Sequence, residues 1–188
     1  MPIVKQKNEE IQVHDKTFTP YLRHSQIQEA VYRIANEITN DFTNYDTPPV
    51  FIAILNGSFV FAADLMRALP IDSEITFIKA KSYLGLTSTG ELNTLIGLDI
   101  DLSNRAAIII EDIVDTGNTV KQLLENLAGK VKTVKVACLL HKPDALLHKN
   151  LQIDYIGIEI PNKFVVGYGL DYNGLGRTYK DIYQLVSD

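Results

Sequence analysis

The chain has 188 residues, a formal net charge of −5 at pH 7 and a single cysteine. This length predicts one domain with a sizeable core, and the acidic balance argues against nucleic acid or an anionic membrane as the partner, because either would favour a basic surface. No signal peptide opens the sequence and no apolar run approaches membrane-spanning length, so we expect a cytoplasmic protein.

The N-terminal part of the chain predicts a polar segment followed by a helix. Residues 1–24 are polar, with two short β-like runs. Ser25 followed by Gln28 forms a capping-box pattern, so we expect a helix with Ser25 as its N-cap. The apolar positions that follow repeat with a helical period: Ile27, Ala30, Val31, Ile34, Ala35 and Ile38.

The next segment predicts a buried strand, a turn and a second helix. Val50–Leu55 is a continuous apolar run, Asn56-Gly57-Ser58 forms the turn, and a helical pattern extends to about Leu69. Another strand follows near residues 74–82. The segment 83–97 then concentrates Gly, Ser and Thr, and a loop of this length inside a compact domain is usually a functional lid or disordered. We expect a lid or a twisted hairpin with a polar connection.

The centre of the chain combines acids with a turn suited to phosphate. Residues 106–110 are apolar and largely β-branched, which is typical of a strand buried on both faces. Glu111, Asp112 and Asp115 follow, and the turn Thr116-Gly117-Asn118-Thr119 precedes a helical pattern. This order places the acids at the carboxyl end of a strand, where open α/β sheets bind ligands. The turn offers backbone N–H groups at a helix N-terminus, which suit phosphate.

Acids beside a phosphate site predict a phosphorylated sugar as the ligand. Because acids repel phosphate, the ligand should present hydroxyls or a divalent metal to the acids and its phosphate to the turn, as a ribose 5-phosphate does. An ordinary strand-to-helix turn with a capping Asp is the simpler alternative, but a cap needs one acid and this turn has three. The chain has no G-x-x-x-x-G-K-[ST] and the turn no D-x-D, which excludes a Walker-type loop and an aspartyl phosphatase site.

The remaining segments complete an α/β pattern. Residues 132–140 predict another strand, and Lys142 follows its end, on the same rim of the sheet as Asp115 and Gly57. Further β-like runs occupy 154–160 and 163–169, separated by Pro161-Asn162. The prediction is a mostly parallel twisted sheet flanked by helices, with a small hood built from the N- and C-terminal segments.

We expect a single domain over residues 1–188. Its core would lie at about 25–150, and its hood at about 1–24 and 151–188.

The central run resembles a known family motif. Ile109-Ile110-Glu111-Asp112-Ile113-Val114-Asp115-Thr116-Gly117 is similar to the phosphoribosyl pyrophosphate (PRPP) motif of the type I phosphoribosyltransferases, with the acids and the Thr-Gly at the family's spacing. Leu55-Asn56-Gly57-Ser58-Phe59 resembles the family loop that holds pyrophosphate through backbone amides. The resemblance implies that Asn56 and Gly57 bind substrate and that the Leu55–Asn56 peptide is cis. Many members carry Lys or Arg where this chain has Asn56, so a charge is missing.

Later segments resemble the 6-oxopurine branch of the family. Ser82-Tyr83 is similar to the mobile loop that closes over the transition state and shields it from water. Lys142 matches the lysine that donates to the exocyclic oxygen of a 6-oxopurine. The run 160–172 strongly resembles the purine-binding tail of hypoxanthine (guanine) phosphoribosyltransferases. That tail implies that Phe164 stacks on the base and that the main chain of Val165 reads its edge.

The resemblance implies a reaction and a role for each acid. A 5-phosphoribosyl group would pass from PRPP to N9 of hypoxanthine or guanine, giving IMP or GMP and pyrophosphate. Glu111 and Asp112 would orient the ribose and, with Asp171, hold Mg²⁺. Asp115 would handle the proton on the purine's imidazole ring, and Arg177 would meet pyrophosphate. The family also leads us to expect a homodimer or homotetramer.

Two other functions stay open at this stage. A non-catalytic regulator that senses PRPP or a nucleotide is favoured by the missing charge at Asn56, and disfavoured by the combination of Asp115, Lys142 and Phe164-Val165. A phosphoribosyltransferase for another base is the second alternative, and the tail argues against pyrimidines but not against xanthine.

Overall fold

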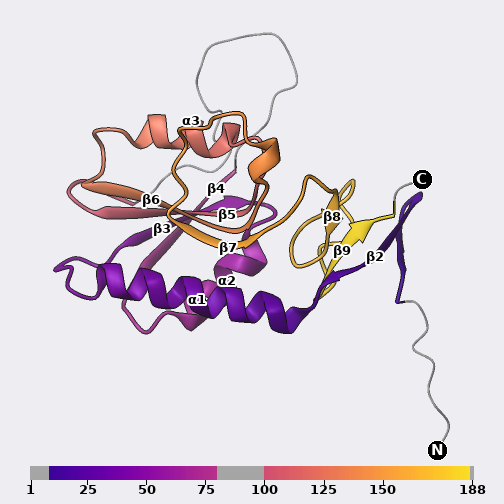
Figure 1. The fold of residues 1–188 in the computed structure, drawn as a ribbon. Helices are drawn as coiled ribbons and strands as arrows, with labels where there is room; N and C mark the ends of the chain where they lie inside the picture. The colour runs from indigo at the N-terminus through magenta and orange to yellow at the C-terminus, as the bar shows by residue number, and fades with distance from the viewer. Residues whose placement is uncertain (1–8, 80–99, 187–188) are drawn as a thin grey trace, which may run out of the picture.

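The computed structural model of the chain describes residues 9–79 and 100–186. Its main layer is a parallel sheet with the strand order β4-β3-β5-β6-β7 (Figure 1). The strands are β3 (Val50–Leu55), β4 (Glu74–Lys79), β5 (Ala106–Val114), β6 (Thr133–His141) and β7 (Tyr155–Glu159). The inner strands are nearly continuous runs of buried side chains, as expected for a parallel sheet covered on both faces.

Helices cover both faces of this sheet. The long α1 (His24–Phe42) and α2 (Phe59–Ala68) lie on one face, and α3 (Asn118–Leu127) lies on the other (Figure 1). A short 3₁₀ turn, η1 (Pro143–Ala145), follows β6. Every position of the predicted α1 stripe is buried, because these side chains face the α2 side of the sheet. The predicted α/β fold is confirmed.

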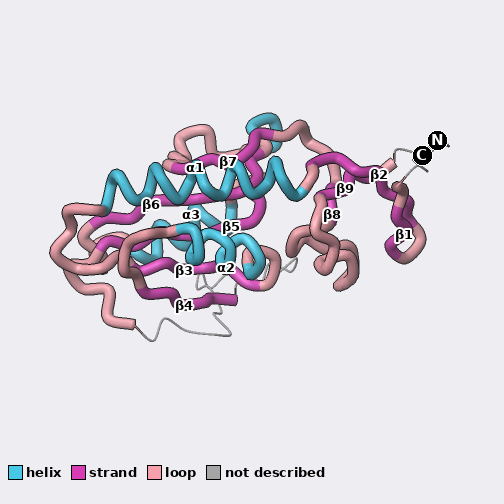
Figure 2. Tube along the Cα trace, turned by 90° about the horizontal axis from the view of Figure 1, so that it is seen from below, coloured by secondary structure: helices cyan, strands magenta, loops and turns pink. Residues whose placement is uncertain are grey.

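A second, antiparallel sheet forms the hood at one end of the molecule. Its order is β1-β2-β9-β8, and Figure 2 shows it beyond the end of α1. The strands are β1 (Ile11–Val13), β2 (Lys16–Leu22), β8 (Val165–Val166) and β9 (Ile182–Leu185). Phe18 of β2 pairs with Leu185 of β9, so the two ends of the described chain are joined in this sheet. The hood is therefore built from both ends of the described chain, as predicted.

Two local predictions differ from the structure. The first helix begins at His24, with Arg23 rather than Ser25 as its N-cap. The reason is a long-range contact, because Asp181 Oδ1 accepts the His24 N–H at 2.7 Å while Gln26 Oε1 accepts the Arg23 N–H at 2.9 Å. The central strand is also longer than its apolar run and extends to Val114, so two acids lie within it.

None of the helices in the described ranges 9–79 and 100–186 is both long enough and apolar enough to cross a bilayer.

Candidate active site

Three neighbouring strands bring their carboxyl ends to the edge of the sheet that faces the hood. β3, β5 and β6 pair in parallel, so the segments after Leu55, Val114 and His141 emerge side by side. The tail is tied to this edge, because Ile160 N–H donates to His141 O at 2.8 Å and the backbone at Gly169 meets the β3–α2 loop. The predicted gathering of the central acids, Gly57 and Lys142 at one rim is what the structure shows.

Asp112 lies against the loop after β3. A methyl group added at Gly57 would overlap the Asp112 carboxylate, so a larger residue there would have to displace that side chain. Gly169, with φ of +99°, approaches the same loop from the hood, and a side chain there would overlap the Gly57 carbonyl. The Leu55–Asn56 peptide is cis, as the family resemblance implied. The loop after β3 is therefore in close contact with the Asp112 side chain of β5 and with the backbone of the tail at Gly169.

Arg177 joins the tail to this contact. Its Nη1 donates to Gly169 O at 2.6 Å and its Nη2 pairs with Asp171 Oδ1 at 2.7 Å. Asp171 Oδ2 accepts the Gly174 N–H at 2.7 Å, so the tail loop holds its own acid and base together. The charge of Arg177 also acts on Asp112, because it opposes the rise in pKa that burial causes in that carboxyl.

Burial raises the pKa values of the two strand acids. Desolvation raises the pKa of Asp112 to about 6, although the N–H groups of Asp112 and Ile113 and the Arg177 charge oppose the shift and Asp171 adds to it. Desolvation also raises the pKa of Glu111 well above its ordinary value, and the charge of Asp112 adds to the effect. Glu111 Oε2 is buried and has no hydrogen-bond partner among the residues that the structure describes. This oxygen is an open acceptor.

Lys142 and Asp115 form an ion pair at the same edge. Lys142 Nζ donates to Asp115 Oδ2 at 2.9 Å, although the two residues are 27 positions apart. The lysine side chain is 7% exposed and the aspartate 44% exposed. Lys142 N–H also donates to Val114 O at 2.9 Å, which fixes the lysine beside the end of β5. A buried cation and a half-exposed acid therefore face the same space.

The turn after Asp115 has the geometry of an anion site. Gly117 is the N-cap of α3 with φ of +79°, a left-handed conformation that favours glycine, and as a glycine it has no side chain to cap the helix. The helix N-terminus is therefore open to a ligand. Thr116 Oγ1 accepts the Asn118 N–H at 3.4 Å and Thr119 is half-buried in the first turn of α3.

The hood presents an aromatic side chain. Phe164 is 45% exposed, and its ring lies 5.8 Å from Tyr172 and 6.3 Å from Phe18. Val165 is buried in β8, and the chain before it returns to β6 through Ile160. One ring of an aromatic cluster is thus left accessible. Ser82 and Tyr83 lie outside the described residues.

Two supporting residues had no signal in the sequence. His148 Nε2 donates to Asn118 Oδ1 at 2.7 Å, and Leu147 N–H donates to Thr116 O at 3.1 Å. Both follow η1 and hold the turn from outside. Neither belongs to a recognisable motif, because their roles depend on how the segment after β6 folds back on α3.

The acids do not form a metal cage by themselves. Within the described residues, no group of three His, Cys, Asp or Glu side chains is arranged to hold a metal ion. Mg²⁺ usually takes one or two carboxylates together with substrate phosphates and water. The open acceptor on Glu111 and the nearby Asp112 fit such a substrate-borne ion.

A parallel sheet with acids and an open helix N-terminus at its carboxyl edge defines an α/β protein that binds phosphorylated ligands. The chain matches the phosphoribosyl transferase domain family over residues 19–173. It is 38% identical over 167 residues to the hypoxanthine-guanine phosphoribosyltransferase of Mycobacterium tuberculosis, covering 86% of this chain and 81% of that one. It is 35% identical to the hypoxanthine phosphoribosyltransferase of Escherichia coli over 150 residues, covering 79% and 84%.

Solved structures of phosphoribosyltransferases have a similar fold. A hypoxanthine-guanine phosphoribosyltransferase from Bacillus anthracis superposes with a TM-score of 0.81 at 37% identity, covering 89% of this chain and 98% of that one. A hypoxanthine phosphoribosyl transferase from Trypanosoma cruzi gives a TM-score of 0.83 at 31% identity, covering 94% and 95%. The chain belongs to the phosphoribosyl transferase family and is a phosphoribosyltransferase enzyme.

Proposed function

We propose that this enzyme transfers 5-phosphoribosyl from PRPP to N9 of hypoxanthine or guanine in purine salvage, giving IMP or GMP and pyrophosphate. The observation that carries the proposal is the pairing of Lys142 with Asp115 beside the open turn of α3. A cation that donates to a base oxygen, an acid that takes a base proton and a phosphate cradle are the three groups this transfer needs. The similarity to relatives named for these bases supports the same substrate class.

Binding of PRPP follows from the open groups of the site. The turn Thr116-Gly117-Asn118-Thr119 receives the 5′-phosphate at the α3 N-terminus. The orphaned Oε2 of Glu111 accepts a hydrogen bond from a ribose hydroxyl, and Asp112 supports the same face of the sugar. The backbone at Asn56 and Gly57, together with Arg177, binds the leaving pyrophosphate. Asn56 is exposed and contributes no charge, so Arg177 carries the positive charge there.

Mg²⁺ is the proposed cofactor. Glu111, Asp112 and Asp171 are the carboxylates that would hold it, either directly or through water. A bound ion would supply positive charge that offsets the charge of the leaving pyrophosphate. Asp171 is kept beside Arg177 by their ion pair, so its carboxylate stays in the site before substrate arrives.

Base selection rests on the tail and on Lys142. Phe164 offers its exposed ring to the purine and the Val165 main chain offers hydrogen bonds to the base edge. The Lys142 ammonium has donors only, so it favours an exocyclic oxygen and disfavours the amino group of adenine. Asp115 accepts the proton from the imidazole ring of the purine when Lys142 Nζ donates to the exocyclic oxygen of the base. Ser82 and Tyr83 are proposed to belong to the loop that closes over the bound substrates.

The setting of the reaction is proposed from the same family. We propose a cytoplasmic enzyme that acts on PRPP and a 6-oxopurine as a homodimer or homotetramer, with no nucleic-acid or membrane partner. Residues 1–188 would form a single domain, with its core at about 25–150 and its hood at about 1–24 and 151–188.

The proposed role of Lys142 in base recognition can be tested by substitution. Lys142→Met removes a charged hydrogen bond of about 1.5–3 kcal/mol, so kcat/KM for hypoxanthine should fall about 10- to 100-fold while the Kd for PRPP changes less than about threefold. Lys130→Met is the matched control, because Lys130 is exposed and outside the site. Steady-state pyrophosphate release and calorimetry measure the two quantities. Equal losses in purine use and PRPP affinity would remove Lys142 from base recognition.

The same assay separates the alternatives. Hypoxanthine, guanine, xanthine, adenine, orotate and uracil are offered in turn with PRPP and Mg²⁺. Turnover with xanthine alone would change the assigned base, and PRPP binding without turnover on any base would indicate a regulator.

A further inference from the structure

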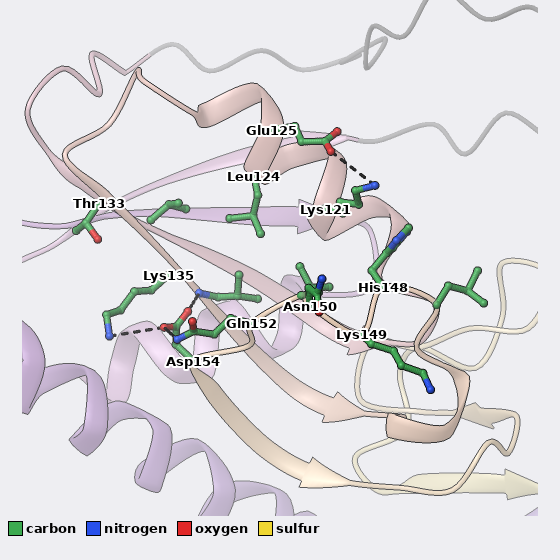
Figure 3. A pocket seen from close by; sticks show the side chains of 14 residues that line it. Lys121, Leu124, Glu125, Thr133, Lys135, His148, Lys149, Asn150, Gln152 and Asp154 are labelled. Carbon is green, nitrogen blue, oxygen red and sulfur yellow. Dashed lines mark hydrogen bonds and ion pairs between the residues drawn. The ribbon is translucent and has the colours of Figure 1, made fainter.

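A second cavity lies outside the proposed active site. It has a volume of about 820 Å³ and is bounded by α3, β6 and the segment 147–154 that follows η1 (Figure 3). None of the residues assigned above to PRPP, base or metal lines it. The size is that of a small-molecule site.

The cavity has an apolar part that is exposed. Leu124 of α3, Val134 of β6 and Leu151 contribute to its lining, together with Leu147. Leu147 is 66% exposed, the highest value for a large hydrophobic side chain among the described residues. Covering this side chain with an apolar group is favourable, because apolar surface leaves water. An apolar ligand body therefore fits the cavity.

The charged part of the cavity favours an anion. Three lysines and two acids line it, although the whole chain carries a net charge of −5. Lys135 is held by Asp41 at 3.0 Å and Asp154 at 3.7 Å. Lys149 is exposed and has no ion pair within the residues that the structure describes.

The available cations gather on one side of the cavity. Figure 3 shows Lys121, His148 and Lys149 along one side and the Lys135–Asp154 pair on the other. Lys121 lies 3.7 Å from Glu125, a distance that leaves most of its donors free. His148 already donates its Nε2–H to Asn118, so Lys121 and Lys149 are the two donors available to a ligand on this side.

We propose that this cavity is a binding site for a small organic anion. Its apolar ring or chain would cover Leu147, and its carboxylate, sulfonate or phosphate would face Lys149 and Lys121. The charged group is held by two ammonium donors, and the apolar body supplies most of the buried area.

The cavity is connected to the turn that holds the PRPP phosphate in the proposed function, and the regulatory part of the inference rests on that function. Leu147 N–H donates to Thr116 O at 3.1 Å, and His148 donates to Asn118 at 2.7 Å. Gly117 packs so closely against Leu151 that an added side chain would lie 2.7 Å from it. A ligand that orders the segment 147–151 therefore also orders the turn, so PRPP binds more tightly.

The binding site is tested with the fluorescent anion 8-anilinonaphthalene-1-sulfonate on the full chain. We expect saturable binding of one probe that persists with saturating PRPP and Mg²⁺. Lys149→Glu should raise the probe's Kd at least fivefold, while Lys130→Glu, the same charge change at an exposed lysine outside the cavity, should raise it less than twofold. Circular dichroism checks that both variants fold. Equal effects of the two variants, or full displacement by PRPP, would overturn the proposal.

The connection is tested by measuring the Kd for PRPP with and without saturating probe. Wild type should bind PRPP about fivefold more tightly with probe, a typical size for coupled sites, and Lys149→Glu should show no change. An unchanged Kd in wild type refutes the regulatory connection. A protein that binds no PRPP refutes the proposed function instead, while Lys149-dependent probe binding would still establish the cavity as a site.

Discussion

The ion pair between Lys142 and Asp115 predicts an asymmetric effect on stability. Lys142 is 7% exposed and its ammonium donates to Asp115, which is 44% exposed. Asp115→Ala leaves a buried cation without its partner, whereas Lys142→Met leaves an acid that water already reaches. Breaking a fully buried ion pair costs about 3–5 kcal/mol. Because the Asp115 side of this pair is half-exposed, water can reach Lys142 in the variant and reduce that cost, so we expect Asp115→Ala to cost about 2 kcal/mol. Lys142→Met should cost about 0–1 kcal/mol, as for an exposed pair.

Urea unfolding at pH 7 of the two single variants and the double variant measures these values. The double variant should be no less stable than Asp115→Ala alone, because it contains no unpaired buried charge. The slope of the transition should be unchanged, which shows that the unfolded states are comparable. Equal costs for the two single variants, or a cost below 0.5 kcal/mol for Asp115→Ala, would refute the reasoning from burial.

Three further predictions concern the acids, the β3–α2 loop and the tail. Burial raises the pKa of Asp112 from 3.8 to about 6, so its contribution to stability is present below pH 3.8 and lost as the pH rises to 6. Urea unfolding at pH 4 and 7 should show Asp112→Asn gaining about 2 kcal/mol relative to wild type over that interval, and a constant difference would contradict this. Gly57→Ala, whose methyl overlaps the Asp112 carboxylate, should lose about 1–3 kcal/mol in thermal unfolding and raise the KM for PRPP; unchanged values would mean that the loop is free to move. Tyr168→Phe removes the 2.6 Å hydrogen bond to Asp64 and should cost about 1–2 kcal/mol in urea, against less than about 0.5 for Tyr172→Phe, whose hydroxyl donates to Asp15 in an exposed hydrogen bond; equal costs would count against the burial argument.

The core of the fold follows from local patterns. Val50–Leu55 and the run 106–110 are continuous and apolar, so they predict strands buried on both faces, and both lie in the middle of the sheet. The helical period of the apolar residues is enough to predict the buried face of α1, and all of the predicted positions are buried. These signals are local, since each depends on neighbours a few residues away.

Features set by distant contacts could not be predicted in this way. The cap of α1 depends on Asp181, more than 150 residues later in the chain. β9 has only four residues and no strong period, and it forms because β2 offers a partner edge. The close approach of Gly169 to Gly57 likewise depends on where the hood settles.

The sequence indicated that several candidate side chains share one edge of the sheet, but not how those side chains are arranged. The motif around Asp115 and the position of Lys142 indicated a shared rim, yet no pattern in the sequence indicates that the two form an ion pair. Nor does the sequence reveal that Asp112 faces Gly57, or that His148 supports Asn118, because side-chain directions at strand ends depend on tertiary packing.

The most direct test of the proposed reaction is product formation by the wild-type protein. PRPP, Mg²⁺ and hypoxanthine are incubated with the enzyme, and IMP and pyrophosphate are quantified by chromatography and a coupled assay. The account predicts that the two products appear in equal amounts, that chelating the metal stops both, and that adenine gives neither. Pyrophosphate without IMP, or PRPP bound with neither product from any 6-oxopurine, would contradict it.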